Sequence, residues 1–174
     1  MNQIRYKQRV CNDQEKIGLF LSKTRVGVVS MVDGNVPYAV PVNFVWNEGK
    51  VYFHGMGSGK KVDILSKNNP ISFTVFEEYG TVSDPMPCKA DTAYMSVMIF
   101  GNARKVEDFE EAATALQKIL DKYMPEFYKN PMSASLMEKY RSGHDQNRTA
   151  VFCISPDELT AKENYAEPEQ LFKI

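Results

Sequence analysis

Short extended segments separated by tight turns dominate the first third of the chain. A β-branched run from Arg25 to Val32 precedes the turn Asp33-Gly34-Asn35, and an extended pattern resumes from Val36 to Trp46. A second turn, Asn47-Glu48-Gly49, leads into Val51 to His54. Consecutive short strands joined by such turns favour an antiparallel meander over βαβ units.

Four later segments continue this β pattern. Ile71 to Phe76 and Tyr94 to Val106 are strand-like, and the stretch between them, Glu77 to Asp91, has no clear period, so we expect a loop there. Ala150 to Ile154 predicts a strand and Leu159 to Lys162 a further one. About six strands with few helices indicate a mainly β fold, a small antiparallel barrel whose closure removes exposed strand edges.

Helical periodicity is confined to a few segments. Asn12 and Glu15 have the spacing of an N-cap and the third residue of an opening helix, and a short helix should end before Pro70. Asp108 and Glu111 repeat the capping spacing ahead of the clearest amphipathic helix. A short helical piece is expected from 133 to 140. The apolar residues of the clearest helix recur at intervals of three and four: Phe109, Ala112, Ala113, Leu116, Ile119, Leu120 and Tyr123.

Length and charge limit the possible partners. A chain of 174 residues suits one domain, 1–174, with a core at about 5–163 and a loose C-terminal tail at 164–174. The formal net charge of -1 gives no sequence-wide field for nucleic acid or an anionic membrane, so an anionic ligand needs a local cluster. Without an apolar run of roughly 18–20 residues or a signal-peptide stretch, we expect a cytoplasmic protein.

Cysteine and histidine content argues against metal and disulfide chemistry. The three cysteines are far apart in sequence and form no C-x-x-C pair. With only two histidines, His54 and His144, we expect no metal site.

The segment from Phe53 to Lys61 carries the strongest chemical signal. A strand ends in alternating glycines, Gly55, Gly57 and Gly59, and a helix then opens beside Lys60 and Lys61. Glycines let backbone N–H groups face an anion, and a helix start and lysines add positive charge. The segment therefore indicates a phosphate site, with a flexible turn carrying solvated lysines as the alternative interpretation.

Two common nucleotide motifs do not fit this segment. A Walker A loop would need glycine at His54 and Ser or Thr at Lys61. The dinucleotide fingerprint would need its third glycine one position later and a βαβ setting.

Several spaced motifs together resemble the pyridoxamine 5'-phosphate oxidase-like flavoproteins, and within them the 5-nitroimidazole resistance (Nim-type) branch is the most similar. The resemblance extends from about Arg5 to about Lys162. Its motifs are the runs Val36 to Phe44, Val51 to Gly55, Gly59 to Lys61, and Tyr94 to Val97 followed by Gly101. Met95 departs from the branch pattern, which often has a charged residue there.

The resemblance implies a split β-barrel homodimer with FMN at the subunit interface. His54 would lie beside the flavin and orient substrate or supply a proton; a histidine satisfied by backbone at a strand end is the alternative. The implied cofactor-binding residues are Val40, Pro41, Val42, Asn43, His54, Gly55, Ser58, Gly59, Lys60, Lys61 and Ser96.

The implied activity is FMN-dependent reduction of a small planar acceptor, of the nitroreductase type. A pyridoxamine 5'-phosphate oxidase activity is one alternative, although the basic residues that would hold the vitamin's phosphate are not evident near the C-terminus. A flavin- or haem-binding module without turnover is the other. A small-molecule substrate and a second copy of the chain are the expected partners, with no nucleic acid and no membrane.

Overall fold

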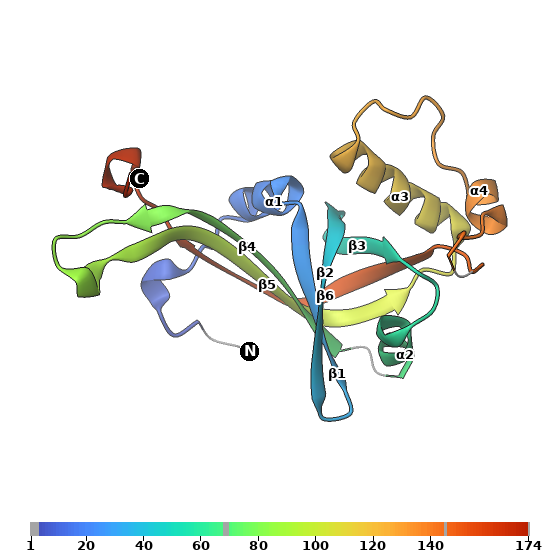
Figure 1. Cartoon of the computed structure of the whole chain (residues 1–174), viewed down its shortest axis with the longest axis horizontal. Helices are drawn as coiled ribbons and strands as arrows, with labels where there is room; N and C mark the ends of the chain where they lie inside the picture. The colour runs from blue at the N-terminus through green and yellow to red at the C-terminus, as the bar shows by residue number, and fades with distance from the viewer. Residues whose placement is uncertain (1–3, 68–69, 145, 174) are drawn as a thin grey trace.

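Six antiparallel strands form a closed barrel in the computed structural model of the chain, which describes residues 4–67, 70–144 and 146–173. The strands follow the order β1-β2-β3-β6-β5-β4 around the barrel (Figure 1). This confirms the mainly β, six-stranded prediction. The strands are β1 (Val26–Asp33), β2 (Val36–Asn47), β3 (Lys50–Gly55), β4 (Pro70–Val82), β5 (Asp91–Lys105) and β6 (Ala150–Asn164).

α3 and α4 lie together on one side of the barrel, and α1 and α2 lie at two other places around it (Figure 1). None of the helices in the described ranges combines the length and hydrophobicity needed to span a bilayer. The α-helices are α1 (Gln14–Lys23), α2 (Lys60–Lys67), α3 (Phe109–Tyr123) and α4 (Ala134–Lys139), and the short 3₁₀ turns are η1 (Lys7–Arg9), η2 (Pro87–Lys89) and η3 (Pro168–Gln170).

The two predicted hairpin turns are present and use left-handed backbone. Gly34 has a φ of 62° between β1 and β2, and Glu48 and Gly49 have φ values of 50° and 74° between β2 and β3. Positive φ at these positions matches the right-handed twist of the flanking strands.

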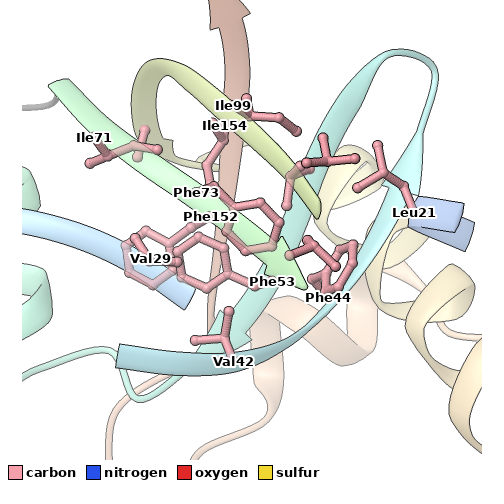
Figure 2. Packing of buried hydrophobic residues seen from close by; sticks show 14 of the residues in the cluster. Leu21, Val29, Val42, Phe44, Phe53, Ile71, Phe73, Ile99, Phe152 and Ile154 are labelled. Atoms are coloured by element: carbon pink, nitrogen blue, oxygen red, sulfur yellow. The ribbon is translucent and has the colours of Figure 1, made fainter. Parts of the chain in front are cut away.

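Two apolar clusters hold the fold together. The first fills the barrel, where the Phe53 and Phe152 rings stack at 5.1 Å and the Phe44 and Phe73 rings meet edge to face at 5.0 Å (Figure 2). The second lies between α3, α4 and the outer face of the sheet, and includes Tyr52 of β3. Each strand near α3 is therefore covered on both faces.

The helix caps follow the sequence closely, with one shift. Asp108 accepts a hydrogen bond from the Glu111 N–H at 2.7 Å, as its spacing predicts. In α1 the N-cap is Asp13, which accepts from the Lys16 N–H at 3.0 Å, so the prediction of Asn12 was wrong by one residue. Asn and Asp are equally good caps, and the sequence offers both side by side.

The predicted loop at Glu77–Asp91 is confirmed for 83–90, but its first part, Glu77 to Val82, is strand. β4 continues to Val82 and β5 begins at Asp91, and the two strands pair from Pro70↔Asn102 to Val82↔Asp91 with a register shift between Glu78 and Gly80. This hairpin extends away from the barrel, on the side opposite α3 and α4 (Figure 1). Pairing between distant segments supplies the backbone bonds that local periodicity does not reveal.

The end of the chain differs in two ways from the expectation. The two predicted strands at 150–154 and 159–162 are one strand, β6, with a register shift opposite Phe100 and Gly101. The tail is not loose over its described residues, because backbone hydrogen bonds join it to the β4–β5 hairpin. The Ser83 N–H donates to the Gln170 carbonyl (3.0 Å), and the Phe172 N–H donates to the Thr81 carbonyl (2.8 Å).

Candidate functional site

The glycine–lysine segment links β3 to α2, as the sequence predicts. β3 ends at Gly55 and α2 begins at Lys60. Gly59 has a φ of 103°, a conformation that favours glycine, and its carbonyl accepts from the Asp63 N–H at 3.1 Å. We call residues 55–59 the glycine loop.

Lys61 is the cation most closely associated with the glycine loop. A β-carbon placed on Gly55 would lie 2.6 Å from the Lys61 Nζ. The same Nζ lies 5.4 Å from the centroids of the Phe53 and Phe152 rings. The ammonium therefore sits where β3 and β6 meet the loop.

This ammonium is partly buried, and the described part of the chain gives it no acidic partner. Burial lowers the pKa of Lys61 from its ordinary value of 10.5. Among the described residues no carboxylate lies within 4.0 Å of it. A partly desolvated charge without a counter-ion is costly, and a bound anion would offset that cost.

Lys60 points elsewhere. Its Nζ lies 3.5 Å from the carboxylate of Asp33 at the β1–β2 turn and 4.9 Å from the centroid of the Tyr38 ring. The two lysines thus contact different parts of the barrel. A phosphate contact by Lys60 requires its side chain to leave Asp33.

His54 lies one residue before the glycine loop and remains exposed to solvent. Its pKa is lowered from 6.5, first because the surrounding protein removes hydration and second because the Lys61 ammonium is near. His54 is therefore neutral at pH 7, and its imidazole can accept a proton or a hydrogen bond there.

The predicted contact strand, Val40 to Asn43, divides into two faces. Val42 is in the barrel core and Val40 packs against it, so their side chains point away from any ligand outside the barrel. Pro41 and Asn43 are exposed. This alternation follows from the two-residue repeat of a strand, and it leaves only the backbone of Val40 and Val42 for a ligand.

One edge of β2 is open beside the glycine loop. β2 pairs with β3 only from Phe44↔Phe53 to Asn47↔Lys50, whereas His54 and Gly55 pair with Val151 and Ala150 of β6. Between residues 36 and 43, β2 therefore pairs with β1 on one edge only.

Strand alternation shows which backbone groups face this open edge. The Phe44 N–H donates to the Tyr123 hydroxyl (2.9 Å), which also donates to the Arg25 carbonyl just before β1. The backbone N–H of Phe44 thus points toward β1. The backbone groups of residues 37, 39 and 41, at the alternate positions of the strand, point toward the open edge. Positions 37 and 41 are prolines, so Ala39 provides the N–H donor between them, flanked by proline carbonyls.

Ser96 is far from the glycine loop within one chain. It pairs with Lys162 of β6, whereas His54 pairs with Val151, eleven residues earlier on the same strand. At roughly 3.3 Å per residue this is about 36 Å along the strand. The structure brings His54, Gly55 and Lys61 together and leaves Ser96 out.

Sequence reasoning missed the segment that packs against Gly57 of the glycine loop. A β-carbon on Gly57 would lie 2.7 Å from the Arg148 carbonyl oxygen and 3.2 Å from the Asn147 Cβ. The available signal was Arg141 and Arg148 on either side of a polar loop, but nothing in the sequence connects that loop with Gly57.

Other candidate sites are separate from this one. A hollow of about 560 Å³ lies between α3 and α4, and its lining contains neither His54 nor Lys61. Within the described ranges, no three His, Cys, Asp or Glu side chains gather in a way that could hold a metal ion.

A closed six-stranded antiparallel barrel with a glycine loop between a strand and a short helix defines the split-barrel class. The model of the pyridoxamine 5'-phosphate oxidase family matches residues 13–163. The chain therefore belongs to the pyridoxamine 5'-phosphate oxidase family, which is a flavin-binding family.

Solved structures share this fold. The flavocytochrome Anf3 from Azotobacter vinelandii is 24% identical with a TM-score of 0.76, over 97% of this chain and 77% of that one. A protein described as a 5-nitroimidazole antibiotic resistance protein from Bacteroides thetaiotaomicron is 25% identical with a TM-score of 0.67, over 88% and 85%. An FAD- and haem-binding protein from Mycobacterium smegmatis is 18% identical with a TM-score of 0.74, over 92% and 75%. No curated protein matches the sequence.

Proposed function

We propose that the protein is a cytoplasmic, flavin-dependent oxidoreductase that reduces a small planar acceptor such as a nitroaromatic compound. FMN is the simplest cofactor that the glycine loop suits. The observation that carries the proposal is the partly buried Lys61 ammonium, which lacks a carboxylate among the described residues and lies against Gly55. The family membership supports a flavin as the ligand.

The residues around the loop suit the parts of a flavin mononucleotide. Lys61 and the first backbone N–H groups of α2 would bind the phosphate. The open edge of β2, with the Ala39 N–H between proline carbonyls, would bind the donors and acceptors on the edge of the ring. The bound flavin would supply the electron transfer.

His54 would act on the proton side of the reaction. It is exposed, neutral at pH 7 and next to the loop, so it can hold a hydrogen bond to the substrate or to a ring nitrogen. A phosphate bound at Lys61 would offset the lysine's charge and raise the pKa of His54 again, which would improve it as a donor.

A homodimer would complete the site. Ser96 of β5 lies beside Lys162 of β6, too far from Val151 and His54 to reach the glycine loop of its own chain. If Ser96 contacts the flavin, a second subunit must supply it. The exposed apolar side chains Phe76 and Tyr79 on the extended hairpin are available for such a contact between chains.

The test is an absorbance spectrum of the purified protein with and without FMN, followed by anaerobic reduction with a nicotinamide donor and addition of a nitroaromatic. We expect a flavin spectrum, bleaching on reduction, and reoxidation by the nitro compound. A colourless protein whose melting temperature does not change with FMN or FAD would contradict the proposal.

The same experiment separates the two alternatives. Oxygen-dependent turnover of pyridoxamine 5'-phosphate would identify a vitamin oxidase, the activity after which the family is named. A Soret band, or a bound flavin that no donor reduces, would identify a binding module without turnover.

A further inference from the structure

A second cationic region lies beside Gly57 of the glycine loop. It is a surface hollow of about 420 Å³. Its lining combines residues from the glycine loop, the end of β5 and the loop before β6: Gly57, Lys105, Arg141, Gln146, Asn147 and Arg148. We call it the Gly57 hollow.

Two guanidinium groups converge in this hollow. Arg141 donates from Nη1 to the Glu138 carbonyl at 2.7 Å, and Arg148 donates from Nε to the same oxygen at 3.0 Å. The Arg148 guanidinium also lies 5.2 Å from the centroid of the Phe109 ring. Both arginines are therefore held in place, and other N–H groups on each remain for a ligand.

Within the described ranges, the positive charge of the hollow is only weakly balanced. Arg141 and Arg148 bond carbonyl oxygens, which carry no net charge, and no carboxylate among the described residues lies within 4.0 Å of either. Lys105 has a 3.5 Å contact with Glu107, whose side chain is 79% exposed. In a chain with a net charge of -1, this is a local concentration of cations.

Gly57 connects the hollow to the flavin site. A side chain at this position would collide with the Arg148 carbonyl oxygen, so the backbone of the two segments can approach closely only because residue 57 is glycine. Gly55, which contacts Lys61, lies two residues earlier. Two residues of chain span at most roughly 7 Å, a separation that one dinucleotide ligand can bridge.

We propose that the Gly57 hollow binds a phosphoryl group of a dinucleotide, in addition to the phosphate expected at Lys61. The inference rests on the proposed function for the ligand at Lys61. Paired arginines suit phosphate because the planar guanidinium binds two oxygens at once. Two ligands carry this chemistry: FAD, in which the cofactor itself has a second phosphoryl group, and a nicotinamide dinucleotide that delivers the electrons.

The first experiment tests the hollow without a flavin. The melting temperature of the protein is measured against ADP and against pyrophosphate, for the wild type, Arg141→Gln, and the Arg141→Gln/Arg148→Gln double variant. Lys118→Gln, which removes one exposed charge from α3, is the control. We expect both ligands to stabilise the wild type and the control. In the double variant the dissociation constant of each ligand should be at least tenfold higher. Arg148 packs on Phe109, so its replacement could prevent folding. In that case the single variant Arg141→Gln tests the proposal.

The second experiment identifies the ligand. If FAD is the source, the double variant loses at least tenfold in affinity for FAD, and its affinity for FMN changes less than twofold. If the nicotinamide dinucleotide supplies the phosphoryl group, the double variant keeps its affinities for FMN and FAD. Its KM for NADH or NADPH then rises at least tenfold.

Unchanged binding of ADP, pyrophosphate, FAD and the nicotinamide donor in the folded variants would overturn the inference. Stabilisation of the wild type by ADP without binding of any flavin would instead contradict the proposed function and leave the hollow as an anion site.

Discussion

The Lys61 ammonium occupies the space beside Gly55 in which a larger residue would place its side chain, with 2.6 Å between Nζ and the position of a β-carbon. The absence of a side chain at residue 55 and the presence of a charge at residue 61 are therefore one structural feature. It brings a cation over the backbone at the point where β3 becomes the glycine loop.

Replacing Lys61 should weaken ligand binding without harming the fold. In Lys61→Met, a charge-assisted contact to phosphate worth about 1.5–3 kcal/mol is lost, so we expect the Kd for FMN or FAD to rise tenfold or more. Because Lys61 is partly buried and lacks a carboxylate among the described residues, the melting temperature of the ligand-free variant should be equal or higher. Flavin titration and thermal melts measure the two effects.

Lys60→Met is the matched comparison. Lys60 is engaged by Asp33, so its removal should weaken binding less than the removal of Lys61. An equal loss in both variants would show that Lys60 leaves Asp33 to bind the phosphate, and no loss in either would remove the phosphate assignment.

Alanine at three glycines should give three different outcomes. Gly55→Ala should weaken flavin binding and keep the fold, because the new β-carbon meets only the flexible end of Lys61. Gly101→Ala should destabilise the protein by about 1–3 kcal/mol or more, since its β-carbon would lie 2.1 Å from the backbone oxygen of Ser155. Gly18→Ala, in open space on α1, should stabilise by up to about 1 kcal/mol.

Urea unfolding of the three variants, with flavin titration, checks this order. A destabilised Gly18→Ala or a fully stable Gly101→Ala would contradict the packing described here.

The parts of the fold that were predicted correctly are those with local signals. The turns at Gly34 and Gly49 need positive φ, and Asp108 caps its own helix, so a few neighbouring residues decide the structure. The loop prediction was wrong for 77–82 because β4 and β5 are held together by pairing across the hairpin, which no local period of these residues reveals.

The site shows the same division between local and distant information. Gly55, Gly59 and Lys61 lie within seven residues of one another, and the prediction of a loop between a strand and a helix is confirmed there. The direction of Lys60 depends on Asp33, and the Gly57 hollow depends on Arg148, which follows Gly57 by about ninety residues. Only the closed barrel brings these groups together.

The pKa of His54 should respond to charge at Lys61. This pKa is below 6.5 in the free protein, so near that pH the folded state binds fewer protons than the unfolded state. The free energy of unfolding therefore decreases as the pH falls below 6.5. Lys61→Met or a bound phosphate should raise the pKa, because each removes or offsets the nearby positive charge. NMR titration of the imidazole protons measures it, with His144→Gln to assign the signals. A pKa unchanged by both would contradict the coupling.

Mixed dimers should show whether two subunits share the site. If Lys61 of one chain and Ser96 of the other contact the same flavin, a heterodimer of Lys61→Met and Ser96→Gln contains one intact site, whereas each variant homodimer contains none. We expect co-expressed, differently tagged chains to bind one flavin per heterodimer with wild-type affinity. Binding as weak as in the homodimers, or a monomeric protein, would contradict the shared site.

Lys122 of α3 should make stability depend on pH above neutrality. Its ammonium donates to the Leu21 and Thr24 carbonyls at 3.2 and 2.6 Å and lies 4.1 Å from the centroid of the Phe44 ring. Burial, and then the charge of Arg25, lowers its pKa to about 8. Between that value and the ordinary 10.5 the unfolded chain binds more protons than the folded chain, so the free energy of unfolding should rise with pH across this window.

In Lys122→Met this rise should be smaller, and Lys61, whose pKa is also lowered, still contributes to it. Urea unfolding at pH 7.5 and pH 9.5 gives the difference, and the exposed Lys118→Met should keep the wild-type dependence. An equal rise in Lys122→Met and the wild type would mean that Lys122 keeps its hydration in the folded protein. The packing of α3 against Phe44 would then have to be looser than the contacts above require.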